Sequence, residues 1–335
     1  MPSDLRGATD NPSYFLVSVS TRENLELCIK YGLAGFPSGE SGAWTFCEIR
    51  DGDFVSFLYG ARAHNLYMVD RREAIVDAEH VPPWKPLHFE ESGKTYYFPF
   101  RLHLRPMRTF IEPIVREEFY YVAENLLLRG GYRKTHFQAD QTTLQRVSEM
   151  GTRADGSVVA LSLPEYATFT LRFTRSTEHI RTPEIFRFRE TILQSAIRRH
   201  LMLGDNLQVL LSQLNFGGAK ASDLEILGEK ALTQGHIDLL LKQRVPIGSS
   251  LKLPIEVKTN KAQPDDLAQL RGYMDELVGE CPTGILLAAD FSKHLVTAAA
   301  DNGIKLVKYA IKADMKKAPT FEEIYESLTL EPLEK

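Results

Sequence analysis

The pattern of hydrophobic and polar residues divides the chain into two differently built halves. Before about residue 108, short runs rich in β-branched and aromatic residues alternate with turn residues, which predicts a series of short strands. The clearest runs are Tyr14–Ser20, Asp51–Gly60, NLYMVDRREAIV and TYYFPFRLHLRPM. A short amphipathic helix is predicted in TRENLELCIKYGLAGFP, where Gly32, Gly35 and Pro37 stop it. One helix among several short strands predicts a small, strongly bent barrel.

Helical and strand-like patterns alternate in the second half. From about Phe110 to Gly151 the pattern is helical, and the following SVVALSLPEYATFTLRFTR is strand-like. Near Thr182, the order Thr, Pro, Glu is a start signal for a helix in TPEIFRFRETILQSAIRRHL. After it come the runs GHIDLLL and LPIEVKT, a helix in QPDDLAQLRGYMDELV, and the runs TGILLAAD and GIKLVKYAI. Strands that alternate with helices predict an α/β domain.

These patterns predict an α+β protein of two domains. We expect a β-barrel with a helical extension over residues 11–150, a linker or bridging strands over 151–182, an α/β domain over 183–315 and a C-terminal tail over 316–335. The composition, 43% hydrophobic and 25% charged, is that of a globular protein. The three cysteines lie far apart and form no C-x-x-C pair, so neither disulfides nor a zinc site is predicted, and a reducing, cytoplasmic setting fits best. We expect neither a signal peptide nor a membrane span.

Charge is unevenly distributed along the chain. The formal net charge of −4 argues against bulk coating of nucleic acid. Between Arg172 and Arg199, however, seven arginines stand against three glutamates. This run is a candidate track for a DNA backbone, with Arg187, Arg189, Arg198 and Arg199 as its expected phosphate contacts. The alternative is that these arginines form an ordinary solvated helix face.

Two acidic residues stand inside otherwise apolar strand patterns. Asp238 lies in GHIDLLL, and Glu256 lies in LPIEVKT. A carboxylate in a buried strand is costly unless it is paired or binds a cation. Magnesium prefers a few carboxylate oxygens, and it can polarise a phosphodiester and activate water. The two acids are therefore candidate ligands of a metal that supports phosphodiester hydrolysis.

A lysine follows the second acid at strand spacing. Glu256 and Lys258 are two residues apart, so both side chains point to the same face of the strand, with the backbone carbonyl of Val257 between them as a further candidate ligand. The intervening RVPIGSSLK permits a hairpin that sets the two acidic strands side by side. The lysine could then neutralise phosphate charge or orient water. The alternative is a buried acid–lysine pair in an ordinary sheet.

The order GHIDLLL, PIEVKTNKA and QLRGYMDEL resembles that of the PD-(D/E)xK nucleases. It is similar in particular to the RecB-like branch, whose helical Q-x-x-x-Y is matched by Gln269 and Tyr273, and within it to the C-terminal domain of NucS-type endonucleases. The resemblance implies the α/β core of that family. It also implies DNA cleavage with Mg²⁺, or alternatively Mn²⁺, at Asp238, Glu256 and Lys258.

This resemblance extends from about Glu184 to Ile311 and includes the upstream helix. In the family an acid of that helix helps to bind metal, and Glu190 is its counterpart here. Glu184 and Glu225 lie nearby in sequence and stay open as alternatives. The glutamine and tyrosine of Q-x-x-x-Y are four residues apart and share one helix face, where the family uses them to position the lysine and the phosphate. Taken without the triad, they would be a cap and a core residue.

Other polar residues near these motifs have simpler explanations. Asp265 and Asp266 precede the Q-x-x-x-Y helix and are expected to be first-turn acids favoured by the helix dipole. His236, at the start of the first acidic strand, is expected to make a hydrogen bond rather than act as a general base. The other histidines show no metal-ligand spacing, and G-x-x-x-x-G-K-[ST] does not occur, so no nucleotide cofactor is predicted.

The stretches YFLVSVS, GLAGFP and WTFCEIRDGDFVSFLYG follow one another in the first half. They resemble an EVE domain of the PUA-like superfamily between about Asn11 and Arg108, whereas WKPLHFEESGKTYYFPF departs from it. Members of that superfamily commonly hold a modified base extruded from nucleic acid, which requires an aromatic slot. Alternatively, aromatic residues on short strands belong to the barrel core, except that Trp44 follows a flexible Gly/Ser loop and is expected at a rim. The candidates for the slot are Trp44, Phe46, Tyr59 and Tyr67.

Together the two resemblances imply a modification-dependent DNA endonuclease, in which the first domain reads a modified base and the second cuts double-stranded DNA nearby. One active site cuts one strand, so a homodimer is expected. A repair nuclease acting on mismatched or branched DNA is the alternative within the same enzyme class. From another class, the chain could be a modified-nucleic-acid binding protein with an inactive nuclease domain.

Overall fold

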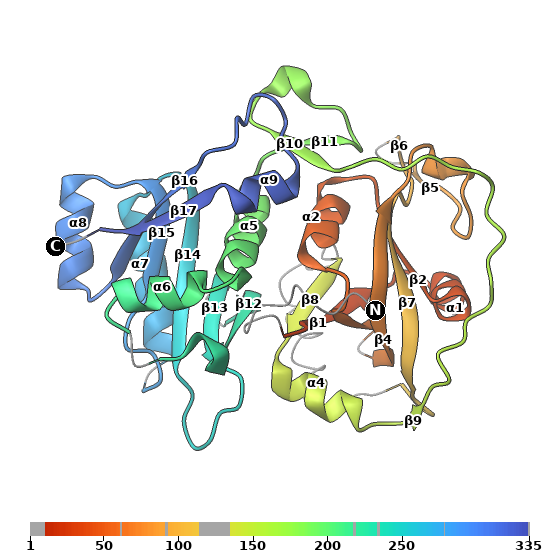
Figure 1. Ribbon diagram of the computed structural model, residues 1–335, viewed down its shortest axis with the longest axis horizontal. Coiled ribbons are helices and arrows are strands. Elements are labelled where there is room, and N and C mark those ends of the chain that lie inside the picture. The colour runs from red at the N-terminus through yellow and green to blue at the C-terminus, as the bar shows by residue number, and fades with distance from the viewer. Residues whose placement is uncertain are drawn as a thin grey trace. The chain divides into compact units, whose positions relative to one another are not determined.

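The computed structural model describes residues 11–60, 62–90, 93–113, 135–216, 219–232, 235–277 and 279–333 (Figure 1). The chain forms two compact units, an N-terminal unit of Pro12–Arg187 and a C-terminal unit that begins at Phe188. Each unit combines helices with its own main sheet. The chain is therefore a two-unit α+β protein, as the sequence predicts.

The N-terminal unit is built mostly from strands. Its helices among the described residues, including two short 3-10 turns, are α1 (Arg22–Tyr31), α2 (Glu40–Glu48), η1 (Ala78–His80), α4 (Gln141–Ser148) and η3 (Thr177–His179). Its strands are β1 (Tyr14–Ser18), β2 (Leu33–Phe36), β3 (Phe54–Tyr59), β4 (Arg62–Ala74), β5 (Leu87–Phe89), β6 (Lys94–Tyr96), β7 (Phe100–Thr109), β8 (His136–Ala139), β9 (Thr152–Arg153), β10 (Arg172–Thr174) and β11 (Ile185–Arg187).

The main sheet of this unit is an open one. Its strands run in the order β2-β7-β4-β3-β1-β8, with β9 beside β7, and β-bulges interrupt the pairing of β4 with both of its neighbours. Within the described ranges no strand joins β2 to β8, so these residues do not form the closed barrel that the sequence predicts. The edge strand β2 contacts α1 and α2.

Part of the predicted glycine-rich loop is a helix. Helix α1 ends where predicted, because Gly32 adopts φ +57° as its C-cap. The following residues form β2, and Glu40–Glu48 form α2, so Trp44 lies on a helix and not after a flexible loop. A side chain at Gly42 would come within 1.9 Å of the Pro37 carbonyl oxygen. This glycine therefore allows the close approach of helix and chain that the sequence pattern could not reveal.

The connection between the two predicted domains also differs from the expectation. Residues 114–134, which carry most of the predicted helix IVREEFYYVAENLLLRGG, lie outside the described residues. The described remainder of that region holds β8 and α4 rather than one continuous helix. Residues 157–171 are mostly irregular and do not form a strand. They belong to the N-terminal unit, where Thr168 makes an isolated β-bridge with Ile75. Local strand propensity is not enough where no neighbouring strand supplies a ladder.

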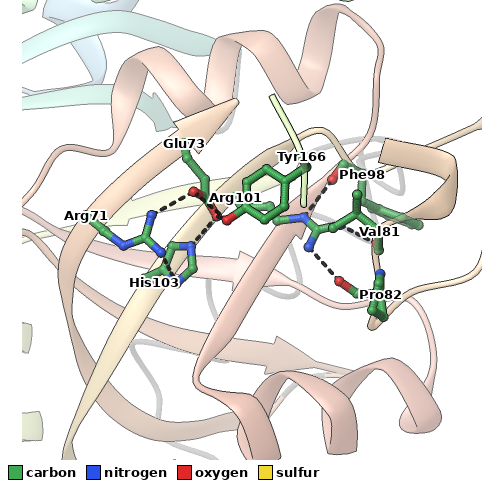
Figure 2. Close-up of polar contacts among 8 residues, drawn as sticks. All are labelled: Arg71, Glu73, Val81, Pro82, Phe98, Arg101, His103 and Tyr166. Carbon is green, nitrogen blue, oxygen red and sulfur yellow. Dashed lines mark hydrogen bonds and ion pairs between the residues drawn. The ribbon is translucent and has the colours of Figure 1, made fainter. Parts of the chain in front are cut away.

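A buried carboxylate links two strands of the N-terminal unit to the irregular segment. Figure 2 shows Glu73 of β4 between Arg71, His103 and Tyr166. Its carboxylate lies 2.7 Å from Arg71 Nη1 and 2.5 Å from His103 Nε2, and the Tyr166 hydroxyl donates to it at 3.1 Å. Burial alone would raise the pKa of Glu73, but hydrogen bonds and charge from His103 and Arg71 lower it to about 2.

A buried arginine lies beside this cluster. Arg101 of β7 is 1% exposed, and its guanidinium donates hydrogen bonds at 2.6 Å to the carbonyl oxygens of both Val81 and Pro82 (Figure 2). It also lies 5.3 Å from the ring centroid of Trp84. Burial lowers the pKa of Arg101 to about 10. These contacts hold the connection between η1 and β5 against the sheet.

The C-terminal unit is an α/β structure around a six-stranded sheet. Its helices are α5 (Glu190–Met202), α6 (Asn206–Gln213), the 3-10 turn η4 (Ala221–Asp223), α7 (Pro264–Glu276), α8 (Lys293–Asp301) and α9 (Phe321–Glu326). Its strands are β12 (Leu224–Ala231), β13 (His236–Gln243), β14 (Lys252–Lys261), β15 (Ile285–Asp290), β16 (Lys305–Ile311) and β17 (Leu328–Pro332), and they pair in this order across the sheet. Strands β14, β15 and β16 are mutually parallel, whereas the others are antiparallel to their neighbours.

Both ends of this unit differ from the predicted boundaries. The helix expected from Thr182 begins only at Glu190, because Ile185–Arg187 pair with β10 as a strand. The expected tail over 316–335 contains α9 and the edge strand β17, which pairs with β16. A strand that gains its partner from elsewhere in the chain carries only a weak local signal.

Helices cover both faces of the central strands. Helices α7 and α8 pack on the face that carries Leu286 and Leu306. Helix α5 contacts α6, α9 and several strands, α6 contacts β17, and Figure 1 shows these three helices on the opposite side. Strands β14, β15 and β16 are therefore buried on both faces, as parallel strands usually are.

Among the residues that the structure describes, no helix is long and apolar enough to span a bilayer.

Candidate active site

Asp238 is positioned where a β ladder ends. Strands β13 and β14 pair in antiparallel register as far as Leu239 and Ile255. One position further, a side chain replaces the ladder, because Asp238 Oδ2 accepts a hydrogen bond of 2.7 Å from the Val257 backbone N–H. The N–H and C=O of one residue in such a strand point to the same neighbour. The Val257 carbonyl therefore faces the same gap as the Asp238 carboxylate.

Glu256 and Lys258 meet on one face of β14, as their spacing predicts. The lysine Nζ lies 2.8 Å from Glu256 Oε1. Glu256 is 0% exposed, and its other oxygen, Oε2, has no hydrogen-bond partner among the described residues. A fully buried carboxylate with an unsatisfied oxygen is unusual in a folded protein.

Two further acids surround Lys258. Its Nζ lies 3.6 Å from Glu190 Oε1 at the start of α5 and 3.8 Å from Asp266 Oδ1 in the first turn of α7. Of the open alternatives for the upstream acid, Glu225 faces Lys242 of β13 at 3.6 Å, and Glu184 belongs to the N-terminal unit.

Sequence reasoning missed Asp266 as a neighbour of the site. It closes the capping box of α7, because its Oδ2 accepts a 2.7 Å hydrogen bond from the Gln263 backbone N–H. Its other oxygen, Oδ1, is the one directed to Lys258. The only signal in the sequence was its position in the first turn of the helix that follows E-x-K, and the capping role explains that position equally well.

The site contains more acid than its lysine neutralises. Burial raises the pKa of Glu256 to about 7, with Glu190 and Asp266 adding to the rise and Lys258 opposing it. Burial and the charge of Glu256 raise the pKa of Asp238 well above its usual range, although a backbone N–H favours its ionised form. Burial would lower the pKa of Lys258, but the surrounding carboxylates outweigh burial and raise it. An additional cation would therefore stabilise the ionised acids.

The Q-x-x-x-Y pair supports the start of β13. The Tyr273 hydroxyl donates to the His236 carbonyl oxygen at 2.8 Å and accepts from Gln269 Nε2 at 2.8 Å. Tyr273 is buried in the core under the sheet, and Gln269 is exposed. A side chain at Gly235 would lie 2.6 Å from the same hydroxyl oxygen. Tyr273 therefore fixes the backbone at His236, two residues before Asp238.

The donor set fits a hard divalent cation. Magnesium commonly binds through one or two carboxylates and keeps several waters. Asp238, Glu256 and the Val257 carbonyl supply oxygen donors, and Glu256 Oε2, which has no partner in the described part of the chain, can accept one more bond. Over the described part of the chain, no three His, Cys, Asp or Glu side chains are already gathered as a complete metal centre. The available donors therefore match a cation that binds few protein ligands and keeps several waters.

The four arginines chosen as DNA contacts divide into two kinds. Arg187 and Arg189 are exposed, and they precede α5. Arg198 is 0% exposed and donates from Nε to the Ile226 carbonyl oxygen at 3.2 Å, and Arg199 is 7% exposed. The expectation that Arg198 and Arg199 contact DNA is therefore wrong. Helix α5 is covered on nearly all sides, so its arginines serve the interior of the unit.

Two of the aromatic candidates for a base slot lie on α2. The half-buried Trp44 packs edge-on against His136, with ring centroids 4.6 Å apart, and its Nε1 has no hydrogen-bond partner among the residues described. Phe46 contacts Phe100, and the Arg72 guanidinium lies 5.3 Å from its ring centroid. These two rings face different surroundings on the same helix.

The other two candidates lie on strands. Tyr59, at the end of β3, is half-buried and lies 6.5 Å from His64 between ring centroids. Tyr67 is 1% exposed and packs 5.2 Å from Phe57, and its hydroxyl accepts a hydrogen bond from Asn65. Tyr67 is thus part of the core, which was the alternative interpretation. No ring contact within the described ranges joins any two of the four candidates.

The chain resembles known proteins only in structure. No protein-family model and no curated protein matches it. It is similar to an EndoMS–dsDNA2 complex (20% identity, 25% of this chain and 35% of that chain, TM-score 0.22) and to a repair endonuclease from Pyrococcus abyssi (19% identity, 30% and 42%, TM-score 0.23). It is also similar to the MspJI restriction endonuclease in complex with a 27-mer oligonucleotide (11% identity, 83% and 68%, TM-score 0.17). The chain matches less than half of the length of the first two, and the likeness to all three is weak.

Proposed function

We propose that this chain is a metal-dependent DNA endonuclease with its active site at the end of the β13–β14 ladder. The observation that carries the proposal is the convergence of Asp238, Glu256 and Lys258. Glu256 is fully buried and has an oxygen without a partner among the described residues, and the nearby lysine is surrounded by acids. Such an arrangement costs stability in a purely structural sheet, so a functional role explains it better.

The residues of the site divide the work of phosphodiester hydrolysis. Asp238, Glu256 and the Val257 carbonyl would hold Mg²⁺ or Mn²⁺, with Glu190 beside them, and the bound ion would polarise the phosphodiester and lower the pKa of water. Lys258 remains cationic and places positive charge where a phosphate oxygen gains negative charge. Tyr273 and Gln269 fix the entry of β13 and therefore the position of Asp238.

Two substitutions in the site and one matched control test this proposal. We expect Glu256→Gln and Lys258→Ala each to lower cleavage of plasmid DNA in Mg²⁺ by on the order of 100-fold or more, while DNA binding is retained. Lys305→Ala is the control, because it removes a lysine from another strand of the same sheet and leaves Asp238, Glu256 and Lys258 unchanged. Full cleavage by both site variants would refute the assignment.

We also propose that the N-terminal unit recognises a modified base and makes cleavage modification-dependent. This part rests on the EVE-like sequence pattern, and the half-buried Trp44, with its unpartnered Nε1, is the side chain best suited to contact an extruded base. A panel of unmodified, methylated, hydroxymethylated and mismatched duplexes tests it. Preference for mismatches would favour a repair endonuclease, and binding without cleavage in any metal would favour a binding protein.

Double-strand cleavage requires two active sites, so we propose that two copies act together on one duplex. Sedimentation of the protein with a cleavable duplex tests this. A complex of one copy that still makes double-strand breaks would contradict it.

A further inference from the structure

A second lysine lies in the same row of the sheet as Lys258. Strands β14, β15 and β16 are parallel and in register, with Lys258 beside Ala288 and Ala288 beside Lys308. Residues paired in this way point to the same face of a sheet. The preceding row, two residues earlier on each strand, is Glu256, Leu286 and Leu306, and its two leucines are core residues beneath α7 and α8. The row of Lys258, Ala288 and Lys308 lies on the same face, two residues closer to the carboxyl ends of the strands.

Lys308 belongs to a small basic group at that edge. Its Nζ donates to Asp290 Oδ1 at 3.1 Å, and Asp290 is paired in the sheet with Lys261 of β14. The hydrogen bond from Lys308, a backbone N–H and the charges of both lysines lower the pKa of Asp290. The Lys308 and Asp290 side chains are 46% and 56% exposed. Two lysines around one aspartate leave an excess of one positive charge.

A hydrogen bond spans the sheet at this edge, where the pairing of β14 with β15 is irregular between Lys258 and Lys261. The Tyr309 hydroxyl donates to the Thr259 carbonyl oxygen at 2.6 Å and so ties β16 to the end of β14 across β15. Two strand spacings separate Lys258 from Lys308, which places their Cα atoms roughly 10 Å apart. Phosphates of one DNA strand follow one another every ~3.4 Å along the helix axis. Because the strand also winds around that axis, neighbouring phosphates are further apart than this rise, and a strand with a phosphate at Lys258 brings one of its next phosphates to Lys308.

We propose that Lys308 and Lys261 form a second phosphate-binding position for the cleaved DNA strand, next along the strand from the one at Lys258. This inference rests on the proposed nuclease function and adds the direction of the bound strand, which crosses the carboxyl ends of β14, β15 and β16 in that order. In the free protein Asp290 neutralises part of the lysine charge. A bound phosphate would take the place of Asp290 as the partner of Lys308, and the negative charge of the nearby carboxylate would weaken the binding of that phosphate.

Binding of a fluorescently labelled random-sequence duplex in EDTA tests the proposal without any cleavage. We expect Lys308→Ala to raise Kd about fivefold and to reduce the slope of log Kd against log salt by about one. Asp290→Asn should lower Kd, because it removes the competing carboxylate. Lys305→Ala is the matched control, since Lys305 lies three residues earlier on β16 and therefore on the other face; it should leave both quantities unchanged.

The opposite signs separate a ligand role from a structural one. If the ion pair only stabilised the sheet edge, Lys308→Ala and Asp290→Asn would both weaken binding, and that result would overturn the proposal. An unchanged salt slope in Lys308→Ala would overturn it as well. The outcome is also independent of catalysis. A wild-type protein that cleaves no DNA would refute the proposed function, whereas the binding comparison would still decide whether Lys308 contacts phosphate.

Discussion

Replacing Glu73 by glutamine is the most direct test of the polar network in the N-terminal unit. The substitution keeps the shape of the side chain but removes the charge that Arg71 and His103 share, and it weakens the acceptor of the Tyr166 hydroxyl (Figure 2). Glu73 is only 9% exposed, so water cannot replace these partners. We therefore expect a clear loss of stability in this unit.

The pKa of Glu73 sets the size and the pH dependence of that loss. A fall from 4.5 to about 2 corresponds to roughly 3 kcal/mol of stabilisation by the ionised form. Because the Arg71 side chain is 53% exposed, solvent screening reduces our expectation to about 2 kcal/mol. A lowered folded-state pKa stabilises the protein above pH 4.5 and loses this effect as the pH falls towards 2. The difference between wild type and Glu73→Gln should shrink over the same window.

Tryptophan fluorescence reports the N-terminal unit alone, because Trp44 and Trp84 are the two tryptophans of the sequence and both lie in that unit. Urea unfolding followed in this way at pH 7 and at lower pH gives the free energy of unfolding for both proteins. Glu26→Gln is the matched control, because Glu26 pairs with Arg22 on the surface and should change stability by less than about 0.5 kcal/mol. A loss that persists unchanged at pH 3 would refute the electrostatic reasoning.

The remaining predictions concern the C-terminal unit. Asp266→Asn keeps a capping oxygen but removes a charge that holds Lys258, so the turnover number for DNA cleavage should fall about tenfold at unchanged DNA affinity, which steady-state kinetics and binding assays measure. Gly235→Ala would place a methyl group 2.6 Å from the Tyr273 hydroxyl oxygen and should destabilise the unit by about 1–3 kcal/mol in thermal unfolding followed by circular dichroism. Mg²⁺ should raise the melting temperature of the metal-free protein, and Glu256→Gln should abolish that rise.

The sequence pattern predicted the C-terminal unit better than the N-terminal one. The runs GHIDLLL and LPIEVKT form β13 and β14 because their periodicity reflects real burial on the sheet. Helix α2 was missed, because Gly39 and Gly42 resemble loop residues. The role of Gly42 depends on the close approach of the Pro37 carbonyl, which only the folded chain reveals. Edge strand β17 was missed for a similar reason, since only its pairing with β16 makes it a strand.

Local spacing could place the main acids but not the whole neighbourhood of the lysine. E-x-K on one strand fixes the relation of Glu256 to Lys258. It contains nothing about Asp266, which reaches the lysine from a helix that starts after a sharp turn, and whose capping role hides its second contact. Arg198 illustrates the opposite error. A basic helix looked solvated in sequence, yet the packing of α5 buries its guanidinium against a backbone carbonyl.

The geometry of the candidate site depends on the register of the β13–β14 hairpin, which is set near its turn. The antiparallel register pairs Lys242 with Lys252, and counting along the ladder from there brings Asp238 opposite Glu256. A slip of one residue would turn one of these acids to the other face and separate the pair. Glu280 holds the register, because its two carboxylate oxygens bind the Ser250 N–H and the Lys252 ammonium at the start of β14. The pairing of two acids on separate strands thus depends on a residue outside both, which is why no motif around either acid contains it.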